Sequence, residues 1–579
     1  MIHHLEAPVA GAQRRAHDRL AWLVLPALLL VAALLPIWSV RYIAPHDYYQ
    51  HLQEAQIVLR YDDPAFDYRS SYLIREGWHL RSNTLSTLAM IWLGHLAPIE
   101  VAGKLALSIY VVLLVGGVTA LLRSLGRPAW LLLLLPPLIY SSPFTSGWLN
   151  WSYGLALCPL AILCYLRWQR AGSPWALALL AGLGVLIYMA HGFAWGMALI
   201  ILCTLAVVDG LPLRRYLMLG LALQGAVPML LAARPLLALA PAAVWGGAWL
   251  AATVVRRLRL RPRTWVALGV AGAGLYLVAA ALFYNLPAIE GLRNAVIPHV
   301  GILPRPRLTA PILLLTLPQF EVPTSWPLVA ANLTLLALLG LAALLLLAGT
   351  VAHHRAHGVA DWRWLTVAGV LALGYVALPS YTPDIEQIEL RVLMLFCLTA
   401  LCWVRLPPPG GWARRALAGV LVALALFSTV ASLAYFARYD ALARGWDAAL
   451  GQLSPRSRIA VIGHSALPIP SGGIYRLKQI NRILNQSQFV TLHSIRHGGF
   501  ATNSLWNGPL APRDPTLLRS HWYDRDAPAE SVAASCGSLR RDYTYLITWD
   551  IVNRELLDAV EGCYGPPLIE QGRFTVWAP

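Results

Sequence analysis

Charge is scarce in this 579-residue chain: 13% of its residues are Asp, Glu, Lys or Arg, and 58% are hydrophobic. Soluble domains carry roughly 25% charged residues, so the composition argues against a soluble enzyme, a disordered chain and a nucleic-acid-binding module. Acidic residues are the scarcer kind, 28 against 45 basic ones, which leaves a net charge of +17. With a mean hydropathy of +0.58, the chain is predicted to be a polytopic membrane protein.

Cysteine is scarce as well, and no spacing among the seven cysteines resembles a zinc site. Five of them lie in apolar runs. The other two, Cys536 and Cys563, lie in the polar C-terminal region, and they would form a disulfide if that region faces an oxidising compartment. Two free thiols are the alternative of equal weight.

The chain also lacks a glycine-rich phosphate loop of recognised spacing and any internal repeat. Transporters usually show repeats and charged groups deep within their spans, whereas polar residues such as Gln224 are few in the apolar runs here. The charges collect in loops instead, which favours chemistry at the membrane surface.

Arginines are clustered in the short stretches between apolar runs, about nineteen of them in all. Such clusters face the cytoplasm in membrane proteins, so this topology signal explains most of the +17 and requires no nucleic-acid partner. Residues 1–19 form a polar cytoplasmic tail. The apolar run from Leu20 to Val40 is expected to be an uncleaved anchor, because no small-residue cleavage site follows it.

Several apolar runs between these clusters exceed the roughly 20 residues of one span and are basic at both ends, so they predict pairs of spans. The outer turns of these pairs are expected at Gly147-Trp148, His191-Gly192, Arg234-Pro235 and Ser380 to Glu389. Two further long runs, at about 264–283 and 327–349, are joined by a polar outer loop.

Residues 84–97 are too few to cross the bilayer comfortably and end at Pro98, so they are expected to lie along the outer surface before a span at 99–122. The result is an α-helical module of about thirteen spans over residues 20–438. The N-terminus is then inside, and the last span, at about 416–437, delivers the C-terminus to the outside.

Composition changes after Arg438 to short apolar strands alternating with helical patterns, which predicts a small α/β domain over residues 439–579. The expected strands are Arg458–Gly463, Phe489–His493 and Tyr543–Trp549. The expected helices are at about 474–486 and 553–562.

The first outer loop, 43–83, begins with the segment from His46 to Glu54, in which Asp47 is the first acid after the membrane. Apolar residues from Tyr48 to Arg60 have near-helical spacing, which predicts an amphipathic helix at the surface. Asp47 near its N-terminus could cap the helix, the more ordinary role, or act as a general base toward a hydroxyl.

Other residues of this loop have two interpretations each. Tyr48 and Trp78 fit an interfacial aromatic belt or a sugar-binding platform. Asp62 and Asp63 form a solvated turn or, as the weaker alternative, bind a divalent cation. These two acids are the basis for considering a metal cofactor in this loop.

A second potential metal cluster lies on the inside, where His353, His354 and His357 precede Asp361. An exposed coincidence explains this cluster better than a metal site, because a cytoplasmic loop implies no pocket there.

Arginines in outer loops run against the positive-inside rule and require a reason. Arg293, Arg305 and Arg307 lie in the loop 284–308, where guanidinium groups would hold a lipid phosphate or extend to lipid head groups without a catalytic role. The loop 380–391 brings Asp384 and Glu389 together with Arg391 at the mouth of a span. His191, at its tight outer turn, is a proton carrier or, more ordinarily, a polar turn residue.

These features resemble the GT-C superfamily of membrane glycosyltransferases. Asp47, in His46-Asp47-Tyr48-Tyr49, matches the acid of the family's first outer loop, and Asn83 to Leu122 looks like the layout that follows that loop. The segment Phe144 to Asn150 resembles the family's glycine-containing outer turn. Glu389-Leu390-Arg391 looks like the arginine that opens a late span and contacts the donor phosphate. Tyr48 stands where many relatives have a second acid.

The resemblance implies a multi-pass enzyme of a bacterial plasma membrane that uses a polyprenyl-phosphate-linked sugar as donor. Asp47 would be the base in an inverting transfer to a lipid, glycan or protein acceptor. Arg391, with Arg293, Arg305 or Arg307, would hold the lipid phosphate. Residues around Asp47 would contact the acceptor or sugar, namely His46, His51, Tyr48 and Trp78. A flippase and a polymerase or ligase of lipid-linked glycans are the alternatives.

Overall fold

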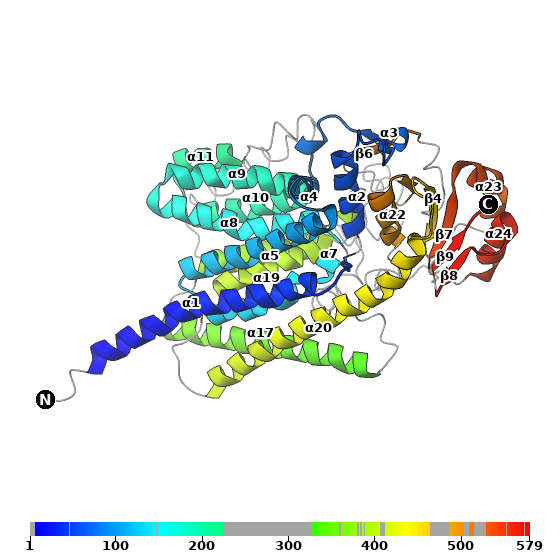
Figure 1. Ribbon diagram of the computed structural model, residues 1–579. Helices are drawn as coiled ribbons and strands as arrows, with labels where there is room; N and C mark the ends of the chain where they lie inside the picture. Colours follow the sequence, from blue (N-terminus) through cyan, green and yellow to red (C-terminus); the bar gives the residue numbers. More distant parts are fainter. Residues whose placement is uncertain are drawn as a thin grey trace, which may run out of the picture.

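The apolar runs of the sequence form long helices that lie side by side, and an α/β region lies at one end of them (Figure 1). In the computed structural model the described residues are 6–45, 47–145, 147–223, 326–357, 361–378, 381–382, 385–386, 388–405, 412–463, 487–502, 509–514, 529–549, 551, 553–572 and 574–579.

Five helices of this described part are long and apolar enough to cross a bilayer. They are α1 (Glu6–Trp38), α5 (Ile99–Ser124), α8 (Leu149–Ala171), α17 (Trp326–His357) and α20 (Trp412–Leu450). The expected spans within residues 216–255 and 264–283 lie almost wholly outside the described residues. The count of about thirteen therefore stays a prediction.

Two of the expected helix pairs are present with the expected turns. Helices α9 (Pro174–Ala190) and α10 (Gly192–Val208) meet at His191, whose extended backbone ends the first helix and whose side chain caps the second. Helices α18 (Trp362–Ala377) and α19 (Ile388–Trp403) flank the second turn, which contains the short strands β2 (Tyr381–Thr382) and β3 (Ile385–Glu386).

The run after Arg127 is broken where a regular span was expected. It forms the 3₁₀ helix η2 (Ala129–Leu134) and the single turns α6 (Pro136–Ile139) and α7 (Ser142–Thr145). Prolines lack the amide hydrogen that a continuing helix needs, and Pro136, Pro137 and Pro143 fall at these breaks. Helix α11 (Leu213–Leu223) follows α10.

Helix α4 (Leu85–Gly94) runs across the direction of α5 and is seen end-on in Figure 1. Ten residues make a helix of about 15 Å, half of what a bilayer core requires. Its exposed side carries Trp92, which is 76% exposed, in keeping with contact with lipid. A helix that does not span is what the sequence predicts for residues 84–97.

Helix α2 (Tyr48–Leu59) forms where it is expected, but its environment differs from the prediction. Ten of its twelve residues are buried, so it is not an amphipathic helix at the surface. It packs against α4 and α5 on one side and, on the other, against the 3₁₀ helix η6 (Ser487–Val490) and helix α22 (Thr491–His497). The C-terminal region covers the face that the sequence pattern assigns to water.

The C-terminal region, meaning the described residues after Leu450, contains a five-stranded sheet in the order β5-β4-β7-β9-β8. Strands β5, β4 and β7 are parallel, and β9 and β8 continue the sheet antiparallel. Their bounds are β4 (Arg458–Gly463), β5 (Phe500–Ala501), β7 (Tyr545–Trp549), β8 (Ile569–Gln571) and β9 (Phe574–Trp577).

Both faces of this sheet are covered. Alternate residues such as Ile462 and Leu546 pack against α23 (Ala529–Asp542) and α24 (Arg554–Tyr564), while Val461 and Ile547 face the core shared with the long helices. The strands expected at Arg458–Gly463 and Tyr543–Trp549 are confirmed, and so is the helix at 553–562.

The strand expected at Phe489–His493 is wrong, because this segment forms the end of η6 and the start of α22. Phe489 is fully buried and lies edge-on to the rings of Tyr42, Tyr49 and Trp446. A short apolar run can fill a core as a helix or as a strand, and burial among these rings decides for the helix. The helix expected at 474–486 lies outside the described residues.

The first loop and the C-terminal region share one hydrophobic core. Strand β1 (Tyr72–Ile74) pairs antiparallel with β6 (Leu510–Pro512). The hydroxyl of Tyr68, from the single turn α3 (Tyr68–Ser71), donates 2.6 Å to the carbonyl oxygen of Ser494. The short 3₁₀ helix η1 (Trp78–Leu80) follows β1. These contacts bind segments that are more than 400 positions apart in the sequence.

Ion pairs also join the long helices to the C-terminal region. Arg496 of α22 donates to the carboxylate of Glu100 at 2.7 and 3.1 Å and to that of Asp447 at 2.5 Å. Asp440 of α20 accepts the amides of Arg41 and Tyr42 at 2.8 and 2.7 Å. The contacts fix the start of α5, the end of α20 and the segment after α1 to one another.

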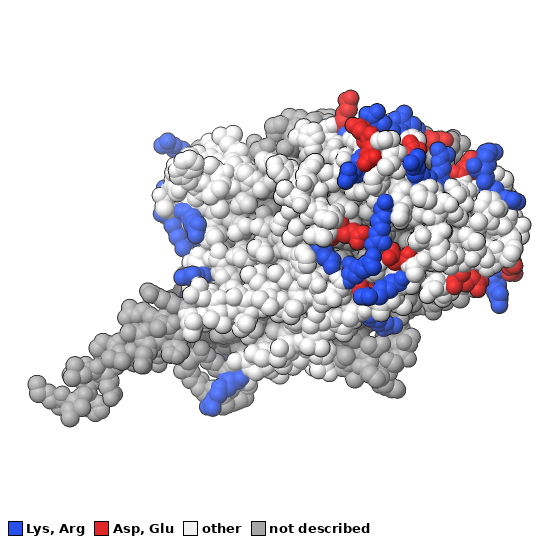
Figure 2. Space-filling view, viewed as in Figure 1, with Lys and Arg blue, Asp and Glu red and all other residues white. Residues whose placement is uncertain are grey.

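On the face seen in Figure 2, the sides of the helical bundle carry almost no charge. Charges of both signs mix over the C-terminal region and its junction with the bundle, whereas only Lys and Arg are seen at the far ends of the helices. This pattern suits helices whose sides face lipid.

We predict that Arg496→Met lowers the free energy of unfolding by about 1–3 kcal/mol, because Glu100 and Asp447 lose their shared partner in a partly buried place. Denaturant unfolding in detergent measures this. Arg541→Met is the matched control, since its pair with Asp542 is mostly exposed and such pairs contribute about 1 kcal/mol or less. Equal losses in the two variants would contradict the prediction.

A second prediction concerns His493, where burial and then the nearby His497 lower the pKa to about 4. An unfolded histidine has a pKa of about 6.5, so below that pH the unfolded chain binds more protons than the folded one. Stability should therefore fall by about 3 kcal/mol as the pH drops from about 6.5 to about 4. His493→Gln should remove this part of the slope in pH-dependent unfolding, and His79→Gln, at an exposed histidine, should retain it.

Candidate functional site

Asp47 occupies the N-cap position of α2, but its side chain makes no capping hydrogen bond to the helix. The backbone alone closes the first turn, since the His51 amide donates 3.2 Å to the Asp47 carbonyl oxygen. Helix capping, the more ordinary role expected from the sequence, does not explain this carboxylate.

The turn between α7 and α8 lies directly against Asp47. Gly147 has a φ of +84°, and a Cβ atom placed there would lie 2.1 Å from the backbone nitrogen of Asp47 and 2.7 Å from its Cα and Cβ atoms. Those distances are far inside van der Waals contact, so only glycine fits at this position. The backbone of Asp47 is thereby held against Gly147, which directly precedes Trp148.

Arg391 lies in the first turn of α19 and is only 5% exposed. Its guanidinium carbon lies 4.0 Å from the ring centroid of Trp148 and 5.3 Å from that of Trp151. Aromatic faces stabilise a desolvated cation by about 2 kcal/mol. The cation thus lies at the end of α8, one residue along the turn from the contact with Asp47.

His191 brings the turn between α9 and α10 to the same place. Burial and the neighbouring Arg391 hold the pKa of His191 well below its usual value, so its imidazole is neutral at pH 7. Its Nε2 atom lies 3.0 Å from Arg391 Nη1, and its Nδ1 atom accepts the Phe193 amide at 3.2 Å. A neutral imidazole has a single acceptor nitrogen, so the two donors compete for one lone pair.

Asn150 fixes the end of the first loop to these helices. Its Oδ1 atom accepts the Ser86 amide at 2.8 Å, and its Nδ2 atom donates to the Asn83 carbonyl at 2.9 Å. The Ser82 hydroxyl accepts the Gly192 amide at 2.6 Å. The loop, α8 and α10 are therefore held together around the site by directional bonds.

His51 and Glu54 lie on α2 beyond Asp47 and face Thr87 of α4. The Thr87 hydroxyl donates 3.0 Å to Glu54 Oε2, and His51 Nδ1 lies 3.4 Å from the same oxygen. Both residues of α2 are buried, so His51 is not spread on a surface as an acceptor platform.

Tyr48 and Trp78 are also packed in the core, with 2% and 9% exposure. A Cβ atom on Gly103 of α5 would lie 2.2 Å from the Tyr48 hydroxyl, so the ring lies directly on α5. Both rings belong to the hydrophobic core and present no open face to an acceptor.

The acids considered for metal binding have other partners. Asp62 pairs with Arg69, while Asp63 lies 3.6 Å from Arg60 and accepts the Ala65 amide at 2.9 Å. The solvated-turn interpretation therefore accounts for both. Across the described ranges, no group of three or more His, Cys, Asp and Glu side chains is placed to hold a metal.

The second cluster considered for metal also has a different structure. Asp361 is largely buried, with carboxylate contacts of 3.0 Å to Arg127 and 3.4 Å to Arg405. His354 stacks on Trp403 with ring centroids 5.7 Å apart. An internal ion-pair network, and not an exposed coincidence, explains Asp361.

Cys536 of α23 and Cys563 of α24 are joined in a disulfide, so the bridge and not the pair of free thiols is present. Glu389 is 3% exposed in the first turn of α19. The remaining residues expected at the site lie outside the described residues: His46, Arg293, Arg305, Arg307 and Asp384.

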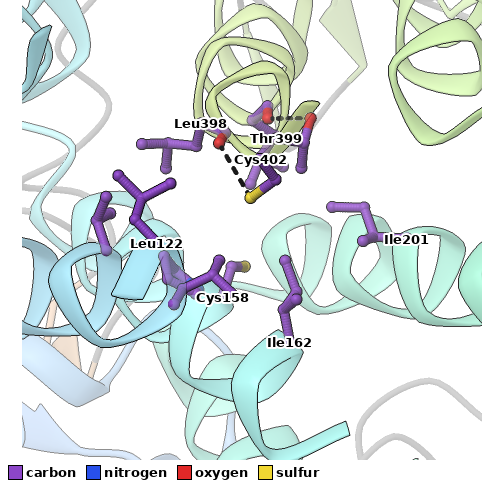
Figure 3. A pocket seen from close by; sticks show the side chains of 11 residues that line it. Leu122, Cys158, Ile162, Ile201, Leu398, Thr399 and Cys402 are labelled. Atoms are coloured by element: carbon purple, nitrogen blue, oxygen red, sulfur yellow. Dashed lines mark hydrogen bonds between the residues drawn. The ribbon is translucent and has the colours of Figure 1, made fainter. Parts of the chain in front are cut away.

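An apolar cavity lies deeper in the bundle, among α5, α8, α10 and α19 (Figure 3). Its polar side chains are turned to their own helices: the Thr399 hydroxyl donates to the Leu395 carbonyl at 2.9 Å, and the Cys402 thiol contacts the Leu398 carbonyl at 3.8 Å. A lining without charge does not suit a phosphate. The charged groups that suit one lie at the ends of the helices.

Several residues of the site have no specific prediction from the sequence. Trp148, Trp151 and Asn150 surround Arg391 or the loop, and Glu54 and Thr87 contact His51. The glycine-containing segment 144–150 was the one available signal for Trp148 and Asn150, and Trp151 lies just beyond it. Tryptophans near a membrane surface otherwise read as an interfacial belt.

No protein-family model and no curated protein sequence matches the chain. Similar solved structures include ArnT from Cupriavidus metallidurans in the apo state, at 15% identity and a TM-score of 0.44 over 96% of this chain and 97% of that one. ArnT bound to undecaprenyl phosphate has 15% identity and a TM-score of 0.43 over 96% and 98%.

The archaeal oligosaccharyltransferase AglB from Archaeoglobus fulgidus, in complex with an inhibitory peptide and a dolichol-phosphate, is also similar. Its identity is 12% and its TM-score 0.44, over 91% of this chain and 69% of that one.

We predict that Gly147→Ala destabilises the protein by about 1–3 kcal/mol, because it combines a positive φ with a clash against the backbone of Asp47. Gly196→Ala in α10 is the matched control: open space surrounds that glycine, and alanine favours a helix. Thermal unfolding followed by tryptophan fluorescence should show a lowered midpoint for the first variant only. A midpoint unchanged in Gly147→Ala would contradict the close approach.

Proposed function

We propose that this protein is a membrane glycosyltransferase that moves a sugar from a polyprenyl-phosphate-linked donor to a lipid, glycan or protein acceptor at the outer face of the membrane. One observation carries the proposal: Asp47 and Arg391 contact successive residues, Gly147 and Trp148, of a single turn. A carboxylate base and a buried cation are thereby gathered at the ends of apolar helices.

Asp47 is the base. Its carboxylate takes the proton from the acceptor hydroxyl while the oxygen attacks the anomeric carbon of the sugar. The lipid phosphate leaves from the opposite side, so the configuration at that carbon is inverted.

Arg391 holds the leaving phosphate. Guanidinium groups bind phosphate oxygens through paired, charge-assisted hydrogen bonds. His191 supplies one lone pair for which Arg391 and the Phe193 amide both compete. A phosphate oxygen is a stronger acceptor for Arg391 than the imidazole is. When phosphate binds Arg391, His191 keeps its bond to the Phe193 amide and caps α10, so Arg391 is expected to exchange His191 for phosphate.

Other residues complete the proposed site from the sequence alone. Arg293, Arg305 and Arg307 are proposed to hold the same phosphate, and Asp384 and Glu389 to orient the arginines. His46 adjoins Asp47 and is proposed to contact the acceptor. The half-buried Trp148 replaces Tyr48 and Trp78 as the proposed aromatic wall of the sugar site, because those two rings are in the core.

Two features support the outer location. Disulfides persist in oxidising compartments, and Cys536–Cys563 lies in the C-terminal region. The basic ends of the helices lie away from that region in Figure 2, as expected for cytoplasmic ends.

The test is sugar transfer in proteoliposomes with a panel of undecaprenyl phosphates that carry a labelled hexose or pentose, with an envelope lipid and glycan extract as acceptor. We expect Asp47→Asn to lower kcat by about 100-fold or more, because the general base is lost. We expect Arg391→Lys to lower kcat/KM by about tenfold or more, because an ammonium replaces a fork that binds phosphate through paired bonds.

Asp62→Asn, at an exposed acid of the same loop, is the matched control and should transfer as the wild type does. Full transfer by both site variants would overturn the site. Movement of the intact donor across the bilayer by the wild type, without cleavage, would favour a flippase instead.

A further inference from the structure

Two buried ionisable side chains of α2, His51 and Glu54, follow the N-cap residue Asp47 and have no role in the transfer proposed above. Asp47, His51 and Glu54 have the spacing i, i+4 and i+7, and the backbone bond from the His51 amide to the Asp47 carbonyl closes the turn between the first two. Side chains four residues apart on a helix lie about 5–6 Å from each other at their Cβ atoms. His51 is therefore the histidine of α2 that lies one helical turn from the proposed base.

Glu54 is the unusual member of the three because it is 1% exposed. Its Oε2 atom accepts the Thr87 hydroxyl at 3.0 Å and lies 3.4 Å from His51 Nδ1. Its Oε1 atom is enclosed and has no hydrogen-bond partner among the described residues. Burying a charged carboxylate costs folding free energy unless a positive charge lies beside it. His51 is the group positioned to supply that charge.

The other elements packed on α2 supply no competing charge. The segment of α4 has no Asp, Glu, Lys or Arg. On α5, Glu100 is paired with Arg496, and Lys104 donates to the Val40 carbonyl.

On α22, the Arg496 guanidinium is shared by Glu100 and Asp447. The His493 nitrogens face the carbonyl oxygens of Leu450 and Ser454 at 3.2 and 3.1 Å, and His497 lies exposed beside that ring.

The His51 ring is oriented by these contacts. Its Nδ1 atom faces both the Glu54 carboxylate and, at 3.4 Å, the Thr87 hydroxyl. A carboxylate that accepts the Nδ1 proton of a histidine leaves Nε2 as the basic nitrogen and stabilises the imidazolium when a second proton arrives. The side chain of His51 keeps 11% of its surface accessible, so a proton can reach it.

We propose that His51, held by Glu54, receives the proton that Asp47 takes from the acceptor. This relay rests on the proposed function. In the first step the acceptor O–H bond breaks, the bond from that oxygen to the anomeric carbon forms, and the sugar–phosphate bond breaks with its electron pair on the lipid phosphate. In the second step the proton moves from the Asp47 carboxyl group to His51 Nε2. The imidazolium then releases it to water, and Asp47 is again a base.

The experiment measures kcat against pH with the undecaprenyl-phosphate sugar that the wild type cleaves. In Glu54→Gln the amide keeps a contact to Thr87 but no longer stabilises a protonated His51. We therefore expect the acid limb of the kcat profile to move to lower pH in this variant. We also expect the plateau to fall by about tenfold. Glu54→Asp retains the charge and should keep the limb of the wild type.

His51→Gln should lower kcat by about tenfold or more. In the His51→Gln background, adding Glu54→Gln should no longer move the acid limb of the kcat profile. Gln53→Met, on another face of α2 where the amide donates to the Tyr72 hydroxyl, is the matched control for a disturbed helix. It should lower the unfolding midpoint without moving the limb, and unfolding midpoints of all variants identify any that fail to fold.

Two results overturn the relay alone: a limb that stays in place in Glu54→Gln while Asp47→Asn is inactive, or wild-type kcat in His51→Gln. Retained transfer by Asp47→Asn would overturn the proposed function, and the relay with it.

Discussion

The structure depends on the burial of α2 from both sides. This helix carries polar side chains on every face, and each needs a partner once water is excluded. Thr87 of the bundle serves Glu54, while Gln56 donates to the Ile495 carbonyl of the C-terminal region at 3.1 Å. The C-terminal region is therefore not an appendage of the long helices. It packs on the second side of α2, and the ion pairs of Arg496 with Glu100 and Asp447 hold it against the long helices.

The site itself combines two close approaches. Gly147 lets one turn lie on the backbone of Asp47, and two tryptophans cover the guanidinium of Arg391. Both depend on the same few residues at the start of α8. A displaced turn would separate the acid from the cation, because nothing else described links them so directly. Glycine adopts the positive φ of this turn without strain, and the packing places charged groups where a low dielectric strengthens their interactions.

Much of this was predictable from residue patterns. The turn at His191, the short helix at 84–97, the helix after Asp47 and the strand Arg458–Gly463 each follow from local periodicity, length or proline positions. Burial was not predictable, because it comes from contacts that local periodicity does not reveal. Tyr48 lies on α5, His51 faces Thr87 of α4, and Gln56 binds the Ile495 carbonyl, which is 439 positions away. Phe489 was mistaken for a strand residue for the same reason. The aromatic walls of Arg391 were hidden because a tryptophan near lipid has a simpler explanation than a cation.

The pairing of β1 with β6 has a consequence for biosynthesis. Chains are made from the N-terminus at about 5–20 residues per second, so the first loop waits on the order of half a minute or more for Leu510–Pro512 to emerge. Until then Tyr68, Tyr72 and the polar faces of α2 have no cover, and a chain that stops early exposes them. The Asp47 helix is thus covered only late in synthesis. A truncated product would therefore be a substrate for proteases.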